Sequence, residues 1–214
     1  MLRFAVVLAS LSLALCGSRT KLHDACLVGN VDAAVKALDE LGAKALKTVS
    51  EDGHNPLHDA SIRGHRAVVS MLLERGADVE ATTWDGVTAL HLAAAGGHQK
   101  VIATLLDAGA KIDMAGERHG DTPLHRAVGS GSLDAVTLLL ERGAPIVADK
   151  YGYTPLHTAA ASGHAKVASL LISRGAEATA VNEDGKTALD VAVRHKHPEM
   201  REILAGGATT KDEV

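Results

Sequence analysis

A repeat about 33 residues long is the feature that most constrains how this chain folds. The motif Gly-x-Thr/Asn-Pro/Ala-Leu-His/Asp recurs along the 214 residues. Its glycines stand 33, 34, 32 and 33 residues apart, at Gly53, Gly86, Gly120, Gly152 and Gly185. A fixed period of this length is typical of supersecondary units that stack into an elongated solenoid, in which each unit contacts only its neighbours.

The copy at residues 152–176 predicts two short helices joined by a tight turn. Thr154 is suited to cap the first helix, and Pro155 to its first position, where the missing N–H costs no hydrogen bond. Gly163 allows the left-handed conformation that ends a helix, and Gly175 marks the end of the second helix. Apolar residues recur in both helices at the spacing of one buried face. The polar stretch that follows predicts an extended finger that turns at the next motif.

These copies resemble the ankyrin repeat. The family's Thr-Pro-Leu-His-x-Ala core stands at residues 122–127 and 154–159, and its Gly-His joint and Leu-Leu-x-x-Gly-Ala helix ending also recur. The resemblance covers residues 20–208. It implies an all-α repeat fold, an ankyrin solenoid of stacked helix-turn-helix units with projecting β-hairpin fingers. Six repeats are expected, near residues 20–49, 50–82, 83–116, 117–148, 149–181 and 182–208.

The apolar composition fits a stack of thin repeats. Apolar residues make up 46% of the chain and aromatic residues only 2%, whereas one globular core of this size would use several large rings. Cys26 falls at the inward first-helix position that Val193 holds in the last repeat, so we expect a buried thiol and no disulfide framework. Four second helices are expected to bury Val68, Val69, Leu72 and Leu73; Val101, Ile102, Leu105 and Leu106; Ala135, Val136, Leu139 and Leu140; and Val167, Ala168, Leu171 and Ile172.

Residues 1–16 differ from the repeats. Arg3 is followed by thirteen residues without a charge, FAVVLASLSLALC, and then by polar GSRTK. A basic start, an apolar run of this length and a small-residue exit are typical of a secretory signal peptide. The run is too short to span a bilayer, which takes about 20 apolar residues. We therefore expect a cleaved signal peptide and no membrane span. The alternatives are an extra apolar helix that covers the first repeat and, if the N-terminus is not cleaved, a cytoplasmic protein.

The polar C-terminal tail, residues 209–214, ends in Lys211-Asp212-Glu213-Val214. This ending resembles the Lys-Asp-Glu-Leu retrieval signal of the endoplasmic reticulum, with Val in place of the final Leu. Together with the signal peptide it predicts a protein of the secretory pathway, either secreted or held in the endoplasmic reticulum lumen. Two alternatives stay open, an incidental polar tail and a carboxyl-terminal ligand for a domain that adds it as a strand.

The charge pattern and the motifs argue against nucleic-acid binding and against common catalytic chemistries. The net charge is −4, and the basic residues form no stripe. The chain has no Gly-x4-Gly-Lys-Ser/Thr phosphate loop and no Gly-x-Ser-x-Gly elbow. Twelve histidines invite a metal site, but most occupy two consensus positions of the resembled family, where imidazoles bond to backbone and cap groups. These are His23, His58, His91, His125 and His157 in first helices, and His65, His98, His164 and His197 at the joints.

Two classes of function remain. The first is a non-catalytic protein–protein interaction module, a monomeric scaffold or adaptor for a protein partner of unknown identity, with no cofactor and no metal. The alternative is a ligand- or metal-dependent enzyme that uses finger carboxylates with His54, His119 and His195. These three histidines stand outside the consensus positions, and we expect them to be isolated.

The predicted partner surface combines the finger tips with the concave face and the ends of the first helices. Trp84, Tyr151 and Tyr153, the only aromatic residues after the signal peptide, all flank turn glycines. Aromatic side chains dominate binding hot spots because they bury much area with few torsions to freeze. The other interpretation is that each ring packs on the neighbouring finger and only stiffens it. The resemblance adds Arg63 and Ser130 at helix ends. The polar candidates are Glu51, Arg63, Asp85, Arg118, His119, Asp121, Lys150, Glu183 and Lys186.

Overall fold

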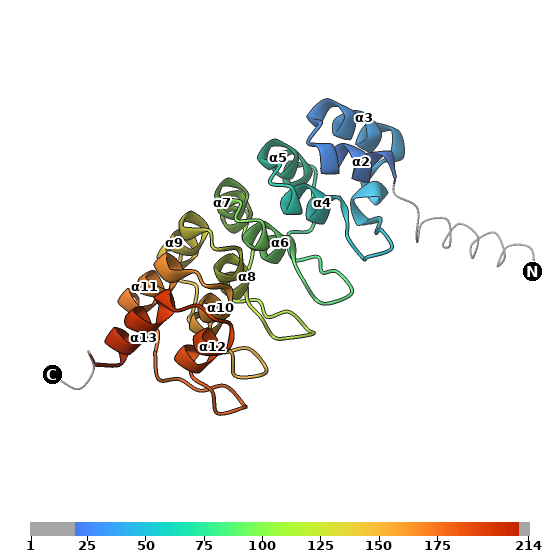
Figure 1. Cartoon of the computed structure of the whole chain (residues 1–214). Helices are drawn as coiled ribbons and strands as arrows, with labels where there is room; N and C mark the ends of the chain where they lie inside the picture. The colour runs from blue at the N-terminus through green and yellow to red at the C-terminus, as the bar shows by residue number, and fades with distance from the viewer. Residues whose placement is uncertain (1–19, 210–214) are drawn as a thin grey trace, which may run out of the picture.

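The computed structural model describes residues 20–209, which form a stack of six helix pairs (Figure 1). The first helices are α2 (Lys21–Val28), α4 (Pro56–Ile62), α6 (Ala89–Ala95), α8 (Pro123–Ser130), α10 (Pro155–Ser162) and α12 (Ala188–Arg194). The second helices are α3 (Val31–Leu41), α5 (Arg66–Glu74), α7 (Gln99–Asp107), α9 (Leu133–Glu141), α11 (Ala165–Ser173) and α13 (Glu199–Thr209). A 3-10 helix that the sequence did not predict, η1 (Ala43–Lys47), follows α3. The predicted all-α solenoid of helix pairs is confirmed.

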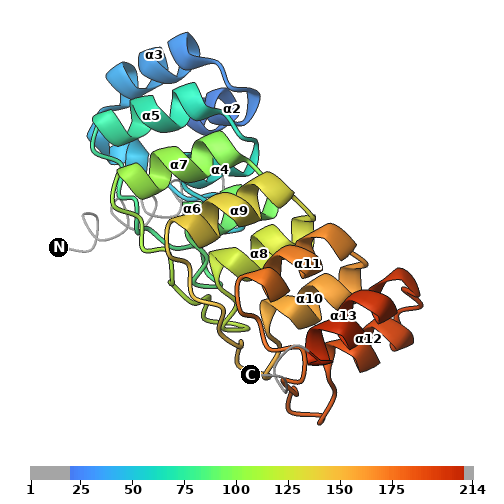
Figure 2. The same cartoon turned by 90° about the vertical axis from the view of Figure 1, so that its left-hand side faces the viewer.

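The helices lie in two layers. The second helices form one layer and the first helices the other, and the fingers project beyond the first helices (Figures 1 and 2). Each helix packs chiefly against its partner within the pair and against the corresponding helices of the neighbouring pairs. The core is therefore a thin continuous band of side chains that runs along the whole stack.

The first helix of the fifth repeat, α10, begins at the predicted capping residue. The Thr154 side chain accepts a hydrogen bond from the N–H of His157, and the His157 side chain accepts one from the N–H of Thr154. Pro155 occupies the first turn between them. The same reciprocal pair opens α4, α6, α8 and α12, with Asn55 as the cap of α4 and Asp190 in the histidine's place in α12. The sequence predicts these helix starts well because both partners lie within one turn.

Small and branched aliphatic side chains fill the core, as predicted. Leu139, Leu171 and Cys26 are fully buried. The prediction that four apolar residues of each second helix are buried is wrong for the last of them, which is only half-buried. That residue is turned by roughly 100° around the helix from the one before it, so it lies at the edge of the packed face. The half-buried residues are Leu73, Leu106, Leu140 and Ile172.

Five fingers end in a similar hydrogen-bonded tip. In four of them an N–H donates to the carbonyl four residues on, as Thr83 does to Val87 at 2.9 Å. In the finger before α8 the bond runs five residues on, from Gly116 to Asp121 at 2.9 Å, so this finger's extra residue lies in the tip itself. Isolated antiparallel bridges pair Thr82 with Thr88 in the finger before α6 and Val181 with Thr187 in the finger before α12. The fingers thus have the connectivity of hairpins with little β structure.

Two predictions fall on residues that the structure does not describe. The predicted signal peptide at residues 1–16 and the Lys-Asp-Glu-Val ending both lie outside residues 20–209. Cleavage and retrieval therefore stay predictions from the sequence. Among the helices of the described part, none is both long and apolar enough to cross a membrane.

Candidate functional site

The histidines of four first helices fasten each repeat to the next finger. In α4, α6, α8 and α10, Nδ1 accepts the N–H of the helix's own cap residue, as His58 does from Asn55 at 3.1 Å. The opposite nitrogen, Nε2, lies against a carbonyl of the following finger and donates to it, as His125 does to Tyr153 at 3.0 Å. Both nitrogens of these buried rings are used by the fold. The predicted structural role is confirmed for the four.

This burial makes the fold sensitive to acid. Burial lowers the pKa of His58 from 6.5 to about 4, and burial also lowers the pKa values of His91 and His125. The unfolded chain therefore binds protons that the folded chain excludes. Each such histidine removes up to about 1.4 kcal/mol of stability per pH unit as the pH falls below its unfolded pKa near 6.5.

We expect the urea concentration at the midpoint of unfolding to fall steadily as the pH is lowered from 6.5 to 5. Circular dichroism measures the unfolding at each pH. This window lies above the range in which most carboxyl groups titrate, so the histidines dominate the slope. A midpoint that stays constant or rises over this interval would contradict the burial of neutral imidazoles.

The joint histidines form a second ladder along the stack. Nε2 of His164 donates to the carbonyl of Gly129 at 3.1 Å, and the ring lies against Gly131. In the fourth repeat Ser132 replaces the histidine, and its hydroxyl donates to the carbonyl of Gly97 in the preceding repeat at 3.4 Å. The same hydroxyl accepts the N–H of Ala135 and so caps α9. The other joint histidines bond to the preceding repeat at 3.0, 3.0 and 3.2 Å; they are His65, His98 and His197.

The fingers are tied to one another side by side. Single backbone hydrogen bonds of 3.0–3.1 Å join consecutive fingers from the one before α6 to the one before α12. These bonds run from Glu117 to Asp85, from Lys150 to His119 and from Glu183 to Tyr151. Between the fingers before α4 and α6, the indole Nε1 of Trp84 donates to the carbonyl of Glu51 at 3.3 Å, and the ring lies over Gly53. The fingers therefore form a connected row.

The three predicted aromatic residues stand in this row but differ in exposure. Trp84 is 65% exposed and Tyr151 is 48% exposed. The Tyr151 ring faces His119 of the preceding finger, with the ring centroids 6.1 Å apart. Tyr153 is half-buried, meets His157 edge-on at 5.6 Å and packs against the core. Trp84 and Tyr151 thus combine a contact to the neighbouring finger with a large exposed area, whereas Tyr153 has a larger share in packing.

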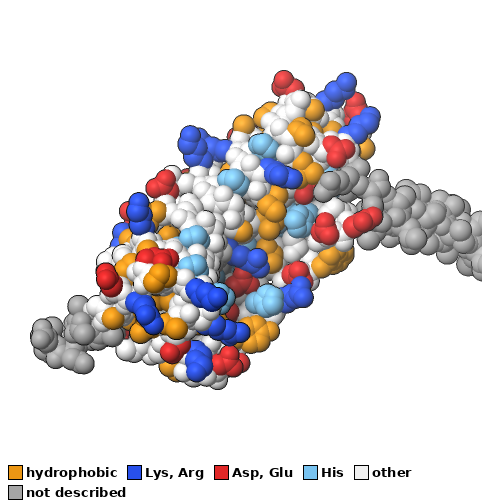
Figure 3. Space-filling model, viewed as in Figure 1, with side chains coloured by type: hydrophobic (Ala, Val, Ile, Leu, Met, Phe, Trp, Pro, Cys, Tyr) orange, Lys and Arg blue, Asp and Glu red, His pale blue; other side chains and the backbone are white. Residues whose placement is uncertain are grey.

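Charged side chains surround these rings. Arg118 Nη1 lies 3.9 Å from Asp85 Oδ1 on the neighbouring finger, and Lys150 Nζ donates to the carbonyl of Glu117. The view in Figure 3 shows basic, acidic and histidine side chains interspersed with apolar ones over this part of the molecule. Mixed charge of this kind is usual at the rim of a protein interface. The remaining candidates Glu51, Arg63, Ser130, Glu183 and Lys186 are also exposed.

A hollow of about 450 Å³ lies where the fingers meet the first helices. His119, Asp121 and Asp149 line its finger side, and Arg126 lines its α8 side. The Arg126 Nε donates to the Asp121 carboxylate, so the two form an ion pair at the edge of the hollow. Arg126 was not among the predicted residues, although the sequence carries a signal for it. It is the one basic residue at the variable position of the Leu-His-x-Ala copies.

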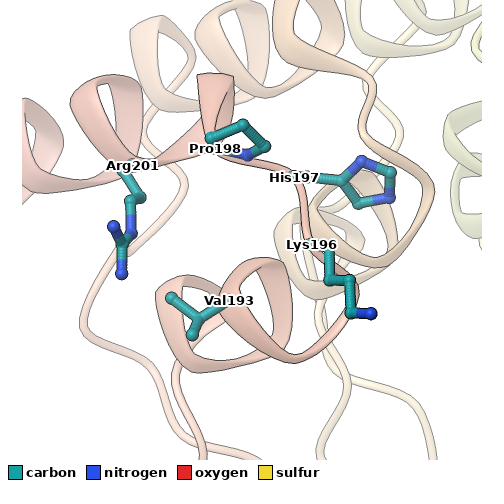
Figure 4. A pocket seen from close by; sticks show the side chains of 5 residues that line it. All are labelled: Val193, Lys196, His197, Pro198 and Arg201. Carbon is teal, nitrogen blue, oxygen red and sulfur yellow. The ribbon is translucent and has the colours of Figure 1, made fainter.

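The last helix pair leaves an open end. Val193 is 48% exposed, although its counterparts Cys26 and Val128 are fully buried. The prediction of an inward-facing Val193 is wrong because no further pair covers α12 within the described residues. The hollow beside Val193 has a volume of about 310 Å³. In Figure 4 the side chains of Lys196 and Arg201 lie on opposite sides of it. Its lining consists of Val193, Lys196, His197, Pro198 and Arg201.

The three histidines of the enzyme alternative belong to separate helix pairs. His54 and His119 lie in the fingers before α4 and α8, and His195 follows α12. As predicted, the three are isolated from one another, although His54 Nδ1 lies 3.5 Å from Asp59 Oδ1 and His119 faces Tyr151. Between residues 20 and 209, no group of three or more His, Cys, Asp or Glu side chains is placed to hold a metal ion.

Comparison with known proteins agrees with this architecture. A family model described as ankyrin repeats (3 copies) matches residues 8–83, 78–150 and 145–213. The chain is 35% identical over 181 residues to the Caenorhabditis elegans transient receptor potential cation channel subfamily A member 1 homolog. The matched region makes up 85% of this chain but only 12% of the length of that protein. Among solved structures it is similar to the ankyrin repeat domain of Bcl-3, a unique member of the IkappaB protein family. That likeness has a TM-score of 0.75 and 30% identity, and it covers 89% of this chain and 87% of the other.

Proposed function

Because this chain belongs to the ankyrin-repeat family, we propose that it is a non-catalytic module that binds a protein partner on its finger tips and the adjoining ends of the first helices. One observation carries the proposal. The fingers form a hydrogen-bonded row that nevertheless leaves its large aromatic and charged side chains exposed. A surface of this kind is ready to bind a partner without first being ordered.

The fixed geometry of the row supports this proposal. Consecutive fingers are joined by backbone bonds or by the Trp84 indole, and each of four fingers is also held by a buried first-helix histidine such as His125. Ordering a free side chain at an interface costs about 0.5–1.5 kcal/mol, and mobile loops add their own cost. Fingers that are already fixed avoid much of this cost when a partner binds.

The distribution of side chains supports the same site. Trp84 and Tyr151 present exposed aromatic area, and Asp85, Arg118 and His119 lie between them along the row. Aromatic hot spots inside a polar rim are the usual anatomy of a protein interface. We therefore expect the partner to lay apolar groups over these two rings.

Trp84→Ala and Tyr151→Ala should each weaken binding of the partner by roughly 1–2 kcal/mol or more, because truncation of a hot-spot ring has effects of this order. The partner is first captured on the purified chain and identified by mass spectrometry, and its affinity is then measured by calorimetry. Leu133→Ala is the matched control, since Leu133 is an exposed apolar residue of α9 in the opposite layer. Tyr153→Ala should weaken binding and also lower the melting temperature, because its ring packs partly in the core.

The two interpretations of the rings separate in this experiment. If Trp84→Ala and Tyr151→Ala lower the melting temperature and leave the affinity unchanged, the rings only stiffen the row and the proposed site is wrong. A loss of affinity in the Leu133→Ala control of the same size would move the site to the opposite layer.

A further inference from the structure

The first repeat is joined to the second by a buried polar cluster that distinguishes this junction from the later ones in the described stack. Asp59 is only 3% exposed. Its carboxylate lies between the imidazole rings of His23 and His54. His23 Nδ1 is 2.6 Å from its Oδ2, and His54 Nδ1 is 3.5 Å from its Oδ1. His23 comes from α2, whereas Asp59 and His54 belong to the second repeat. Later repeats carry no carboxylate at the position of Asp59; the residues there are Leu92, Arg126, Thr158 and Val191.

His23 bonds differently from the other first-helix histidines. Its Nδ1 turns to the Asp59 carboxylate rather than accepting the N–H of its own cap. Its Nε2 lies 3.2 Å from the carbonyl oxygen of Thr48 and 3.1 Å from the hydroxyl of the same residue. That hydroxyl already donates to the carbonyl of Ala45 at 2.7 Å. The predicted bonding to backbone and cap groups is therefore wrong for the Nδ1 of His23.

A count of protons across these bonds assigns two to the His23 ring. An ionised carboxylate only accepts, so Nδ1 must donate to Asp59. A carbonyl oxygen also only accepts, and the Thr48 hydroxyl accepts at Nε2 while it donates to Ala45, so in this arrangement Nε2 donates to Thr48. An imidazole carries N–H on both nitrogens only as the cation. All of these bonds are satisfied together when His23 is an imidazolium beside the Asp59 anion, a pairing that gives short, strong hydrogen bonds.

Asp59 and two titratable groups beside this pair have shifted pKa values. Burial by itself would raise the pKa of Asp59, but hydrogen bonds and charge from His23 and His54 outweigh burial and hold that pKa below its ordinary value. Burial, followed by the Asp59 charge, raises the pKa of the Cys26 thiol to about 12. Burial, followed by the charge of His54, lowers the pKa of His58 to about 4. The other charged side chains of the adjoining elements are exposed: Lys21, Asp24, Asp32, Lys36, Asp39, Glu40, Lys44, Lys47, Glu51 and Asp52.

We propose that a proton-dependent latch, protonated His23 paired with Asp59, docks the first repeat onto the stack. Loss of the proton leaves a ring nitrogen facing an acceptor with no hydrogen between them, and it removes the positive charge that lies nearest to a buried carboxylate. A histidine in an unfolded chain gives up its proton near pH 6.5. Docking of this kind takes up a proton, so it weakens as the pH rises above about 6.5. This sign is opposite to that of the buried neutral histidines in the later repeats.

The latch contacts the finger at one end of the finger row. His54 belongs to the same finger as Glu51, whose carbonyl accepts the Trp84 indole. Release of the first repeat therefore loosens the finger that supports Trp84. The latch itself stands on the contacts of His23 and Asp59 and does not depend on what the fingers bind.

Hydrogen exchange read residue by residue tests the latch in the intact chain. After correction for intrinsic exchange rates, amides of α2 and α3 should be better protected at pH 6 than at pH 8, by up to about tenfold per pH unit for one linked proton. Amides of α8 and α9 should show no such gain. Asp59→Asn and His23→Gln should abolish the difference. Asp24→Asn, which removes an exposed carboxylate of α2, is the matched control and should keep it.

Nitrogen NMR of the rings gives a second readout that needs no variant. At pH 6 His23 should show two protonated ring nitrogens, whereas His58 and His125 should each show one. A neutral His23 ring at pH 6 would overturn the proposal. So would an Asp59→Asn protein whose α2 amides keep the wild-type pH dependence. If Asp59→Asn does not fold, the ring spectrum of the wild-type chain still decides.

Discussion

Replacing Leu139 by alanine should lower the free energy of unfolding by about 2–5 kcal/mol. Leu139 is fully buried in α9, which has helix pairs on both sides. Truncation removes apolar contact and leaves a cavity that neighbouring repeats, fixed by their own packing, close only in part. Equilibrium urea unfolding followed by circular dichroism measures the loss.

Leu204→Ala is the control for this position. Leu204 is 2% exposed, but its helix α13 packs mainly against α11 and α12 and has no pair beyond it in the described stack. A helix at the end of the stack relaxes around a cavity more easily than one in the middle. Its substitution should therefore cost less than that of Leu139, and equal losses at the two positions would contradict the assigned order of repeats.

Gly131→Ala should cost about 2–4 kcal/mol for two separate reasons. Gly131 has φ +71°, and an alanine held in the left-handed region loses roughly 1–2 kcal/mol. A Cβ at this position would also lie 2.6 Å from the His164 ring. Displacement of that ring breaks its hydrogen bond to the carbonyl of Gly129, which adds about 1–2 kcal/mol. The same urea experiment measures the sum.

Gly143→Ala separates the two contributions. Gly143 has φ +88°, and no heavy atom lies within 4 Å of the position of an added Cβ. This substitution should therefore cost only the roughly 1–2 kcal/mol of the left-handed conformation. If the losses at Gly131 and Gly143 prove equal, the joint histidines contribute nothing measurable to stability.

Most of the helical framework could be predicted from the sequence because its signals are local. The first repeat, predicted at residues 20–49, has its second helix from Val31 to Leu41. Thr154 caps α10, and Gly163 ends it in the left-handed conformation, as predicted. Each of these signals acts through a partner one turn away, so a single repeat contains all the information needed.

The candidate site could be predicted only in part. The placement of Trp84 and Tyr151 at finger tips followed from the turn glycines beside them. Their contacts to Glu51 and His119 did not, because those residues come from the preceding finger, about one repeat earlier in the chain. Arg126 was missed for a similar reason. Its role at the hollow depends on the finger residues that face it, which the spacing within one repeat does not reveal.

The sequence by itself determined the period, the two helices and finger of each repeat, the caps and the apolar face that forms the core. The tertiary structure decided which polar groups meet across the junctions. His23 has the same place in its repeat as His125, yet it bonds to Asp59 because the second repeat offers a carboxylate at the point of contact. Val193 repeats an inward position and is exposed because no further pair covers it. Hydrogen bonds within one turn are fixed by neighbours along the chain, whereas burial and protonation depend on whatever the adjacent repeat brings within about 3 Å.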